Sequence, residues 1–166
     1  MKFIDPDGER IIVGTLFGRI MANHCIDNFE KKVTRQLEEL KAMDPCLMKM
    51  ITNLEDPTMD LYIQPEKGKN NRFIRKDKKI LYNPDDHIRK DGKERPPEAA
   101  LAHELGHAEN EKNGTHVKYN EDKVKAGDPV EQNKKNLNEL NPIFYENIVR
   151  EKKGYPERGH NYVNGD

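Results

Sequence analysis

The segment RPPEAALAHELGHAENEKNG, residues 95–114, carries the clearest structural and chemical signal in the chain. The proline pair at residues 96–97 is compatible with the first turn of a helix, and the Asn-Gly pair at residues 113–114 is a typical helix end. The segment therefore predicts one helix between these two pairs. Inside it, His103 and His107 are four residues apart, so their side chains share one face, with Cβ atoms roughly 5–6 Å apart.

This histidine spacing suits a zinc ion, which accepts imidazole nitrogen at about 2.0–2.1 Å and prefers four ligands. Glu104 follows His103 directly, so its side chain leaves the helix about 100° further around the axis and is poorly placed to be a ligand beside both histidines. It is well placed to hold a water molecule whose pKa zinc lowers toward about 7, and to take its proton. The helix therefore predicts two ligands, His103 and His107, and a general base, Glu104, in the HExxH pattern of zinc hydrolases.

A zinc site of this kind needs a third protein ligand. Asn113 stands six residues after His107, where the three-histidine class has its last histidine, so that class is excluded. Glutamates of later helices remain, namely Glu131, Glu139, Glu146 and Glu151. Glu146 is favoured, because it would lie in the first turns of a helix predicted to begin at the Asn-Pro pair of residues 141–142. Glu139 is the reserve.

The rest of the chain predicts an α+β fold in one domain, residues 1–166. Residues 24–43 have apolar residues at steps of three and four, as in an amphipathic helix, and residues 46–57 are ambiguous. Two apolar segments are predicted to be strands. The basic segment between them, residues 66–77, is predicted to be a solvated hairpin tip. The remaining predicted elements are a hairpin-like start at 3–20, strands at 58–65 and 78–84, a short helix at 128–140 and a last helix from 141 to about 154.

Composition excludes several classes of protein. The 166 residues are 34% hydrophobic and 36% charged, with a net charge of −1, which argues against a dedicated nucleic-acid binder. No segment approaches the roughly 20 apolar residues of a membrane span, and the N-terminus lacks the apolar region of a signal peptide. Cys25 and Cys46 form no metal-binding spacing and are expected to be small buried side chains.

The segments HELGHAE (residues 103–109) and ENIVREKKGYPERGHNY (residues 146–162) resemble the bacterial effector-type zinc metalloproteases, the NleD-like family of short HExxH gluzincins. The resemblance covers roughly residues 60–162 and does not place the first 60. It implies Glu146 as the third zinc ligand. A further similarity, to the clostridial neurotoxin light chains, implies that Arg158 and Tyr162 face the scissile carbonyl oxygen, where negative charge develops. These two residues are four apart here and three apart in the relatives, and His160 is a competing donor.

The resulting expectation is a small zincin-like metalloprotease domain, with a short twisted sheet packed on the HExxH helix and a Zn2+ cofactor. Its substrate would be a protein or peptide, paired with an edge strand such as residues 60–65, and the protein would be a monomer. It would be secreted without a classical signal peptide and delivered to a target cell, or stay cytoplasmic if it is not exported. The alternatives are a zinc amidase acting on cell-wall peptides and a non-catalytic zinc-binding module.

Overall fold

The computed structural model has an α+β fold, as the sequence predicts. It describes residues 11–14, 26–56, 58–68, 70–88 and 92–159. The turn of the predicted N-terminal hairpin lies outside these residues, as do Cys25, His160 and Tyr162. The described part contains five α-helices and one four-stranded sheet: β1 (Ile11–Val13), α2 (Ile26–Met43), α3 (Pro45–Glu55), β2 (Leu61–Pro65), β3 (Arg72–Ile74), β4 (Lys79–Tyr82), α4 (Pro97–Lys112), α5 (Glu121–Lys125) and α6 (Pro129–Lys152).

The sheet is mixed, with strand order β1-β2-β4-β3. β1 and β2 are parallel because α2 and α3 connect them, and β2 is also parallel to β4. The prediction of a hairpin tip at residues 66–77 is therefore wrong. That segment contains β3, which pairs antiparallel with β4 at the edge of the sheet. The chain passes from β2 to the edge and returns beside β2 through β4, which no local residue pattern reveals.

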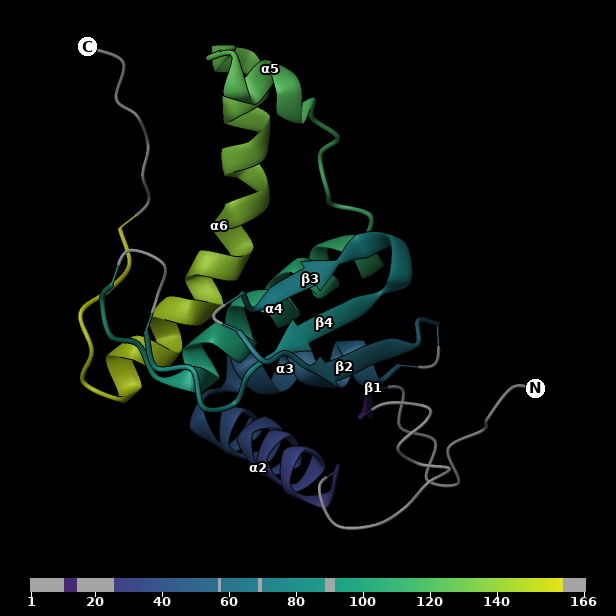
Figure 1. The fold of residues 1–166 in the computed structure, drawn as a ribbon, viewed down its shortest axis with the longest axis vertical. Helices are drawn as coiled ribbons and strands as arrows, with labels where there is room; N and C mark the ends of the chain where they lie inside the picture. Colours follow the sequence, from purple (N-terminus) through teal and green to yellow (C-terminus); the bar gives the residue numbers. More distant parts are fainter. Residues whose placement is uncertain (1–10, 15–25, 57, 69, 89–91, 160–166) are drawn as a thin grey trace.

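The helix that carries the two histidines, α4, lies at the centre of the domain. It begins at Pro97 and ends at Asn113-Gly114, as predicted, with Gly114 at φ 66°. Leu101 and Leu105 are fully buried in the core, together with the small side chains around them. In Figure 1 the sheet lies in front of α3 and α4, and α6 passes beside α4, so α4 is covered on several sides.

Helix α6 differs from the prediction, because it is one continuous helix that begins at Pro129 and passes through Pro142. Asp128 caps it by accepting hydrogen bonds from the first-turn amides. Pro142 has no N–H for the Asn138 carbonyl and crowds it, which bends a helix, and α6 is bent in Figure 1. The carbonyl of Asn138 accepts a hydrogen bond from the Asn110 side chain of α4 at 3.2 Å instead. This tertiary contact allows the helix to continue.

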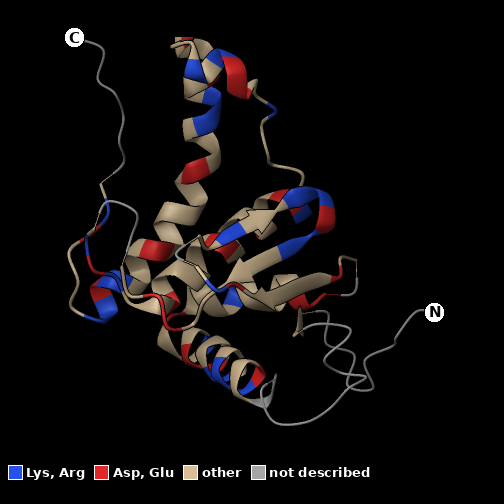
Figure 2. Ribbon diagram, in the orientation of Figure 1, with Lys and Arg blue, Asp and Glu red and all other residues tan. Residues whose placement is uncertain are grey.

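Residues of both signs of charge are spread along the chain, and the visible parts of α2, α5 and α6 contain both Lys or Arg and Asp or Glu (Figure 2). Cys46, expected to be buried, is exposed in the first turn of α3, where its backbone N–H donates to the capping residue Asp44. Among the described helices, none is both long enough and apolar enough to span a bilayer.

Candidate metal centre

Three side chains from α4 and α6 converge on one point. His103, His107 and Glu139 each offer a ligand atom, and these atoms all lie within 4.8 Å of one another. The Nε2 atom of His103 lies 3.4 Å from one Glu139 carboxylate oxygen, and the Nε2 atom of His107 lies 3.5 Å from the other. The two imidazole rings are nearly perpendicular, at 82°. Two imidazoles and one carboxylate are a donor set typical of zinc hydrolases, so the residues fit such a metal.

Close packing of α4 against α6 brings Glu139 to the histidines. Gly106 lies between His103 and His107, and a Cβ atom there would lie only 2.8 Å from the Cα atom of Pro142. The helix backbones can approach this closely because position 106 has no side chain. One turn further along α4, the buried carboxylate of Glu109 accepts hydrogen bonds from α6, at 2.7 Å from the Tyr145 hydroxyl and 2.9 Å from the Asn141 amide.

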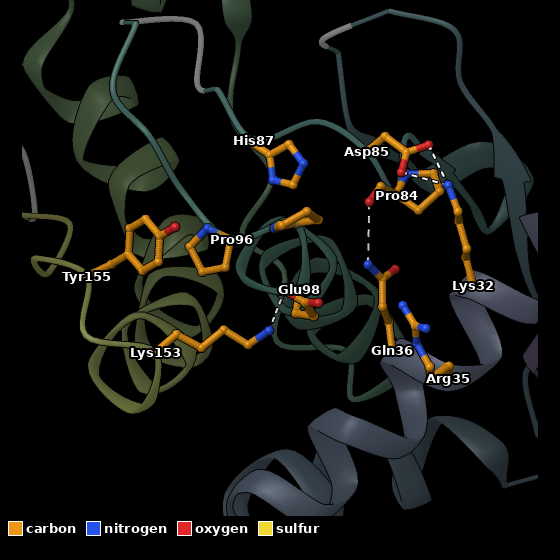
Figure 3. A pocket seen from close by; sticks show the side chains of 11 residues that line it. Lys32, Arg35, Gln36, Pro84, Asp85, His87, Pro96, Glu98, Lys153 and Tyr155 are labelled. Atoms are coloured by element: carbon orange, nitrogen blue, oxygen red, sulfur yellow. Dashed lines mark hydrogen bonds and ion pairs between the residues drawn. The ribbon is translucent and has the colours of Figure 1, made fainter.

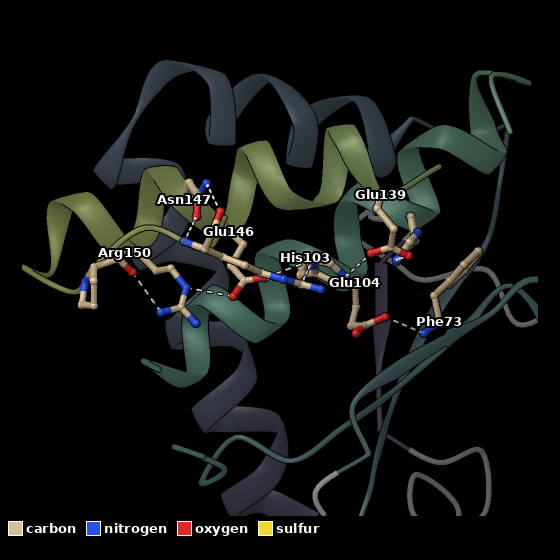
Figure 4. Close-up of polar contacts among 10 residues, drawn as sticks. Phe73, His103, Glu104, Glu139, Glu146, Asn147 and Arg150 are labelled. Carbon is tan, nitrogen blue, oxygen red and sulfur yellow. Dashed lines mark hydrogen bonds and ion pairs between the residues drawn. The ribbon is translucent and has the colours of Figure 1, made fainter. Parts of the chain in front are cut away.

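Glu104 lies beside this cluster and is almost completely buried, at 6% exposed. One of its oxygens accepts a hydrogen bond of 2.7 Å from the backbone N–H of Phe73 in the edge strand β3 (Figure 4). Burial raises the pKa of the Glu104 carboxyl, while the charged His103 ring and this hydrogen bond act in the opposite direction. A carboxylate with a raised pKa beside a metal site is suited to accept a proton. The contact with Phe73 has no signal in the sequence.

The far side of the His103 ring contacts a buried ionic cluster. Its Nδ1 atom lies 3.1 Å from the Glu146 carboxylate and 3.3 Å from the Arg158 guanidinium. Glu146 is fully buried and accepts hydrogen bonds of 2.8 Å from both Arg150 and Arg158. When the Nδ1 atom carries a proton, it donates to Glu146, and the lone pair on Nε2 then faces the cluster with Glu139.

The electrostatics of this cluster favour a positive charge on His103 and a neutral His107. Burial disfavours a charged His103 ring, but hydrogen bonds to Glu139 and Glu146 outweigh it and raise the pKa of His103 to about 9. Burial and the neighbouring His103 charge lower the pKa of His107 to about 3. Glu139 is also partly buried, yet its hydrogen bond to His103 and the nearby His107 hold its pKa at about 2. The carboxylates of Glu139 and Glu146 thus stabilise a positive charge on the His103 ring.

The predicted site residues divide into three groups. His103, Glu104 and His107 lie together, with Glu139, the reserve ligand, completing the cluster. Glu146 and Arg158, expected to be a ligand and a transition-state donor, lie on the Nδ1 side of His103, away from the Nε2 atoms that face Glu139. Tyr162 falls outside the described residues.

The prediction that residues 60–65 form an edge strand able to pair with the substrate is wrong. Residues 61–65 form β2, which lies between β1 and β4 inside the sheet. Among the described strands, β3 is the edge beside α4, and it is the strand that contacts Glu104.

A separate cavity of about 530 Å³ lies between α2, the start of α4 and the end of α6, and it shares no residue with the metal centre. Four of its charged side chains are paired with one another (Figure 3). Lys32 donates to Asp85 at 2.8 Å, and Lys153 lies 2.8 Å from Glu98. The fifth charged side chain, Arg35, is paired with Glu39 of its own helix at 3.4 Å, so the charges of this cavity do not identify a ligand.

Comparison with known proteins identifies the family. The model of the family Peptidase_M91, described as effector protein, matches residues 19–141, which is more than half of the chain. The match includes part of the first 60 residues, His103, Glu104, His107 and Glu139, and it ends before Glu146 and Arg158. No curated protein and no solved structure shows a significant match. The chain therefore belongs to the Peptidase_M91 effector proteins, a family of bacterial effector-type metalloproteases.

Proposed function

We propose that this protein is a zinc-dependent peptidase with a zincin-like active site, in which His103, His107 and Glu139 hold the metal and Glu104 is the general base. The observation that carries the proposal is the convergence of three donor atoms within 4.8 Å, beside a buried carboxylate with a raised pKa. Membership of the effector family supports peptidase chemistry on protein substrates and delivery into host cells.

Glu139 replaces Glu146 as the proposed third ligand. Its two carboxylate oxygens face the Nε2 atoms of both histidines, whereas Glu146 is already engaged by two arginines and by the Nδ1 atom of His103. We assign Glu146 the role of an orienting carboxylate, because metal-bound histidines commonly donate their second ring N–H to such a group.

The reaction follows from the positions of the protein groups. When bound, zinc would supply Lewis acidity, which polarises the scissile carbonyl and lowers the pKa of the attacking water. Glu104 accepts the proton of that water and later transfers it to the leaving amine. The Phe73 N–H, which donates to Glu104, fixes the carboxylate on the side of β3. Tyr162 remains a proposed donor to the developing oxyanion. Arg158 is expected from the sequence to be another, but Glu146 holds its guanidinium on the Nδ1 side of His103, so we assign it to that ionic cluster instead.

Cleavage mapping in a host-cell lysate tests the proposal. Zinc-loaded wild type should generate new peptide N-termini, and Glu104→Gln should reduce their rate of formation about 10²- to 10⁴-fold, the usual contribution of a general base. The side-chain amide of this variant keeps an oxygen for the Phe73 N–H, so folding and zinc content should match wild type. Equal cleavage by both proteins at equal zinc content would refute the role of Glu104.

A further inference from the structure

The end of α6 is built so that the chain turns back along the helix. Gly154 has φ 73°, and the N–H groups of Gly154 and Tyr155 donate to the carbonyls of Glu151 and Arg150 at 3.1 and 2.8 Å. This is the Schellman pattern, in which a left-handed glycine ends a helix. Residues 155–158 therefore return beside the last turns of α6.

Asn147 holds the returning chain at one residue. Its side-chain amide donates to the carbonyl of Arg158 at 3.0 Å, and its side-chain oxygen accepts from the N–H of Arg158 at 2.7 Å (Figure 4). Both backbone groups of Arg158 are thus held by one side chain. Arg150 adds a hydrogen bond of 3.2 Å to the Pro156 carbonyl, so the return segment is attached at two points.

Arg158, whose backbone Asn147 holds, contacts the proposed ligand His103 through its guanidinium. The Nη1 atom of Arg158 donates to Glu146 at 2.8 Å and lies 3.3 Å from the Nδ1 atom of His103. Glu146 in turn lies 3.1 Å from the same Nδ1 atom. A continuous set of contacts therefore runs from the side chain of Asn147, through Arg158 and Glu146, to the ring of a proposed ligand.

We propose that Asn147 is a positioning residue of the metal centre, which orients His103 by fixing the backbone of Arg158. The inference rests on the proposed function, since it assigns His103 as a ligand. Asn147 itself has no contact with His103, His107 or Glu139 among the described interactions, so its effect on the metal must pass through Arg158. Groups outside the coordination sphere of this kind commonly change metal affinity 10- to 100-fold.

Cobalt(II) tests the proposal, because its visible absorption reports the geometry of the ligands. We expect Asn147→Ala of the full chain to bind cobalt about tenfold more weakly than wild type, with a shifted absorption spectrum. Asn133→Ala is the matched control, since Asn133 is an exposed asparagine of the same helix, and it should match wild type. A merely structural role would lower the melting temperature and leave the cobalt spectrum unchanged, and that result would overturn the proposal.

Asn147→Asp covers the case in which the alanine variant does not fold. It keeps the acceptor for the Arg158 N–H, loses the donation to the carbonyl and adds a charge that competes with Glu146 for the guanidinium. It should therefore fold and still shift the cobalt spectrum, and a wild-type spectrum would again contradict the proposal. Failure of wild type to bind cobalt, or unchanged binding by His103→Ala, would instead refute the metal centre itself.

Discussion

His103 shows how a single residue joins the two carboxylate groups of the site. One ring nitrogen faces Glu139 and the other faces Glu146, with only 9% of the side chain exposed. These carboxylates stabilise the imidazolium form of the ring. A divalent cation would take over that positive charge, so metal binding should displace a proton from His103 at neutral pH.

The raised pKa of His103 predicts a pH dependence of stability. Because the folded pKa of about 9 exceeds the ordinary value of 6.5, the stabilisation is complete below pH 6.5 and is lost as the pH rises through 9. We expect the free energy of unfolding of the metal-free protein to fall over this range. Urea titrations in a chelator at several pH values measure it, and His103→Ala should remove this part of the slope. Equal slopes for the two proteins would contradict the assignment.

At the level of elements, the packing of α4 on α6 depends on Gly106. An alanine at an exposed helical glycine usually stabilises by about 1 kcal/mol. At position 106 the added Cβ atom would lie 2.8 Å from the Cα atom of Pro142. This backbone atom cannot move away without displacing α6. Overpacking of this kind typically costs about 1–3 kcal/mol.

Gly106→Ala should therefore destabilise the protein by about 1–3 kcal/mol in urea unfolding and weaken zinc binding, because α6 carries Glu139. The sign of the effect decides the outcome. A variant that is more stable than wild type, with unchanged zinc affinity, would show that the two helices do not approach as described.

The same two helices explain how far sequence reasoning reaches. The ends of α4 follow from local signals, the prolines at its start and Asn113-Gly114 at its end, and the structure confirms both. The course of α6 does not follow from local signals, because a proline inside a helix usually ends it. Here the helix continues through Pro142, because the Asn110 side chain donates to the carbonyl that the proline leaves without an amide partner. A helix starting at Pro142 favours Glu146, whereas the continuous helix brings Glu139 to the histidines.

The sheet shows a second limit of sequence reasoning. β2 and β4 are recognisable from β-branched and aromatic residues and lie where predicted, whereas β3 lies in the segment predicted to be a hairpin tip. Their parallel pairing and the insertion of β3 at the edge depend on contacts between distant residues. The hydrogen bond from Phe73 to Glu104 follows from that topology, and no spacing in the sequence predicts it.

At the level of the whole molecule, the proposed metal centre would add a further link between α4 and α6, in a chain that is only 34% hydrophobic. Zinc that binds only the folded state should stabilise it by about 2.7 kcal/mol at a concentration 100 times the Kd. For a chain of this length the gain corresponds to a rise in melting temperature of about 5–10 °C. Calorimetry with zinc and with chelator measures the rise, and His103→Ala should abolish it. An equal rise in that variant would indicate zinc binding elsewhere.

Zinc affinity in a chelator competition tests the central claim most directly, with wild type compared with Glu139→Gln and Glu146→Gln. Wild type should bind one zinc ion, Glu139→Gln should lose tight binding, and Glu146→Gln should keep the ion with an affinity reduced about 10- to 100-fold. Wild-type affinity in Glu139→Gln, together with loss of binding in Glu146→Gln, would place Glu146 in the coordination sphere and contradict the account.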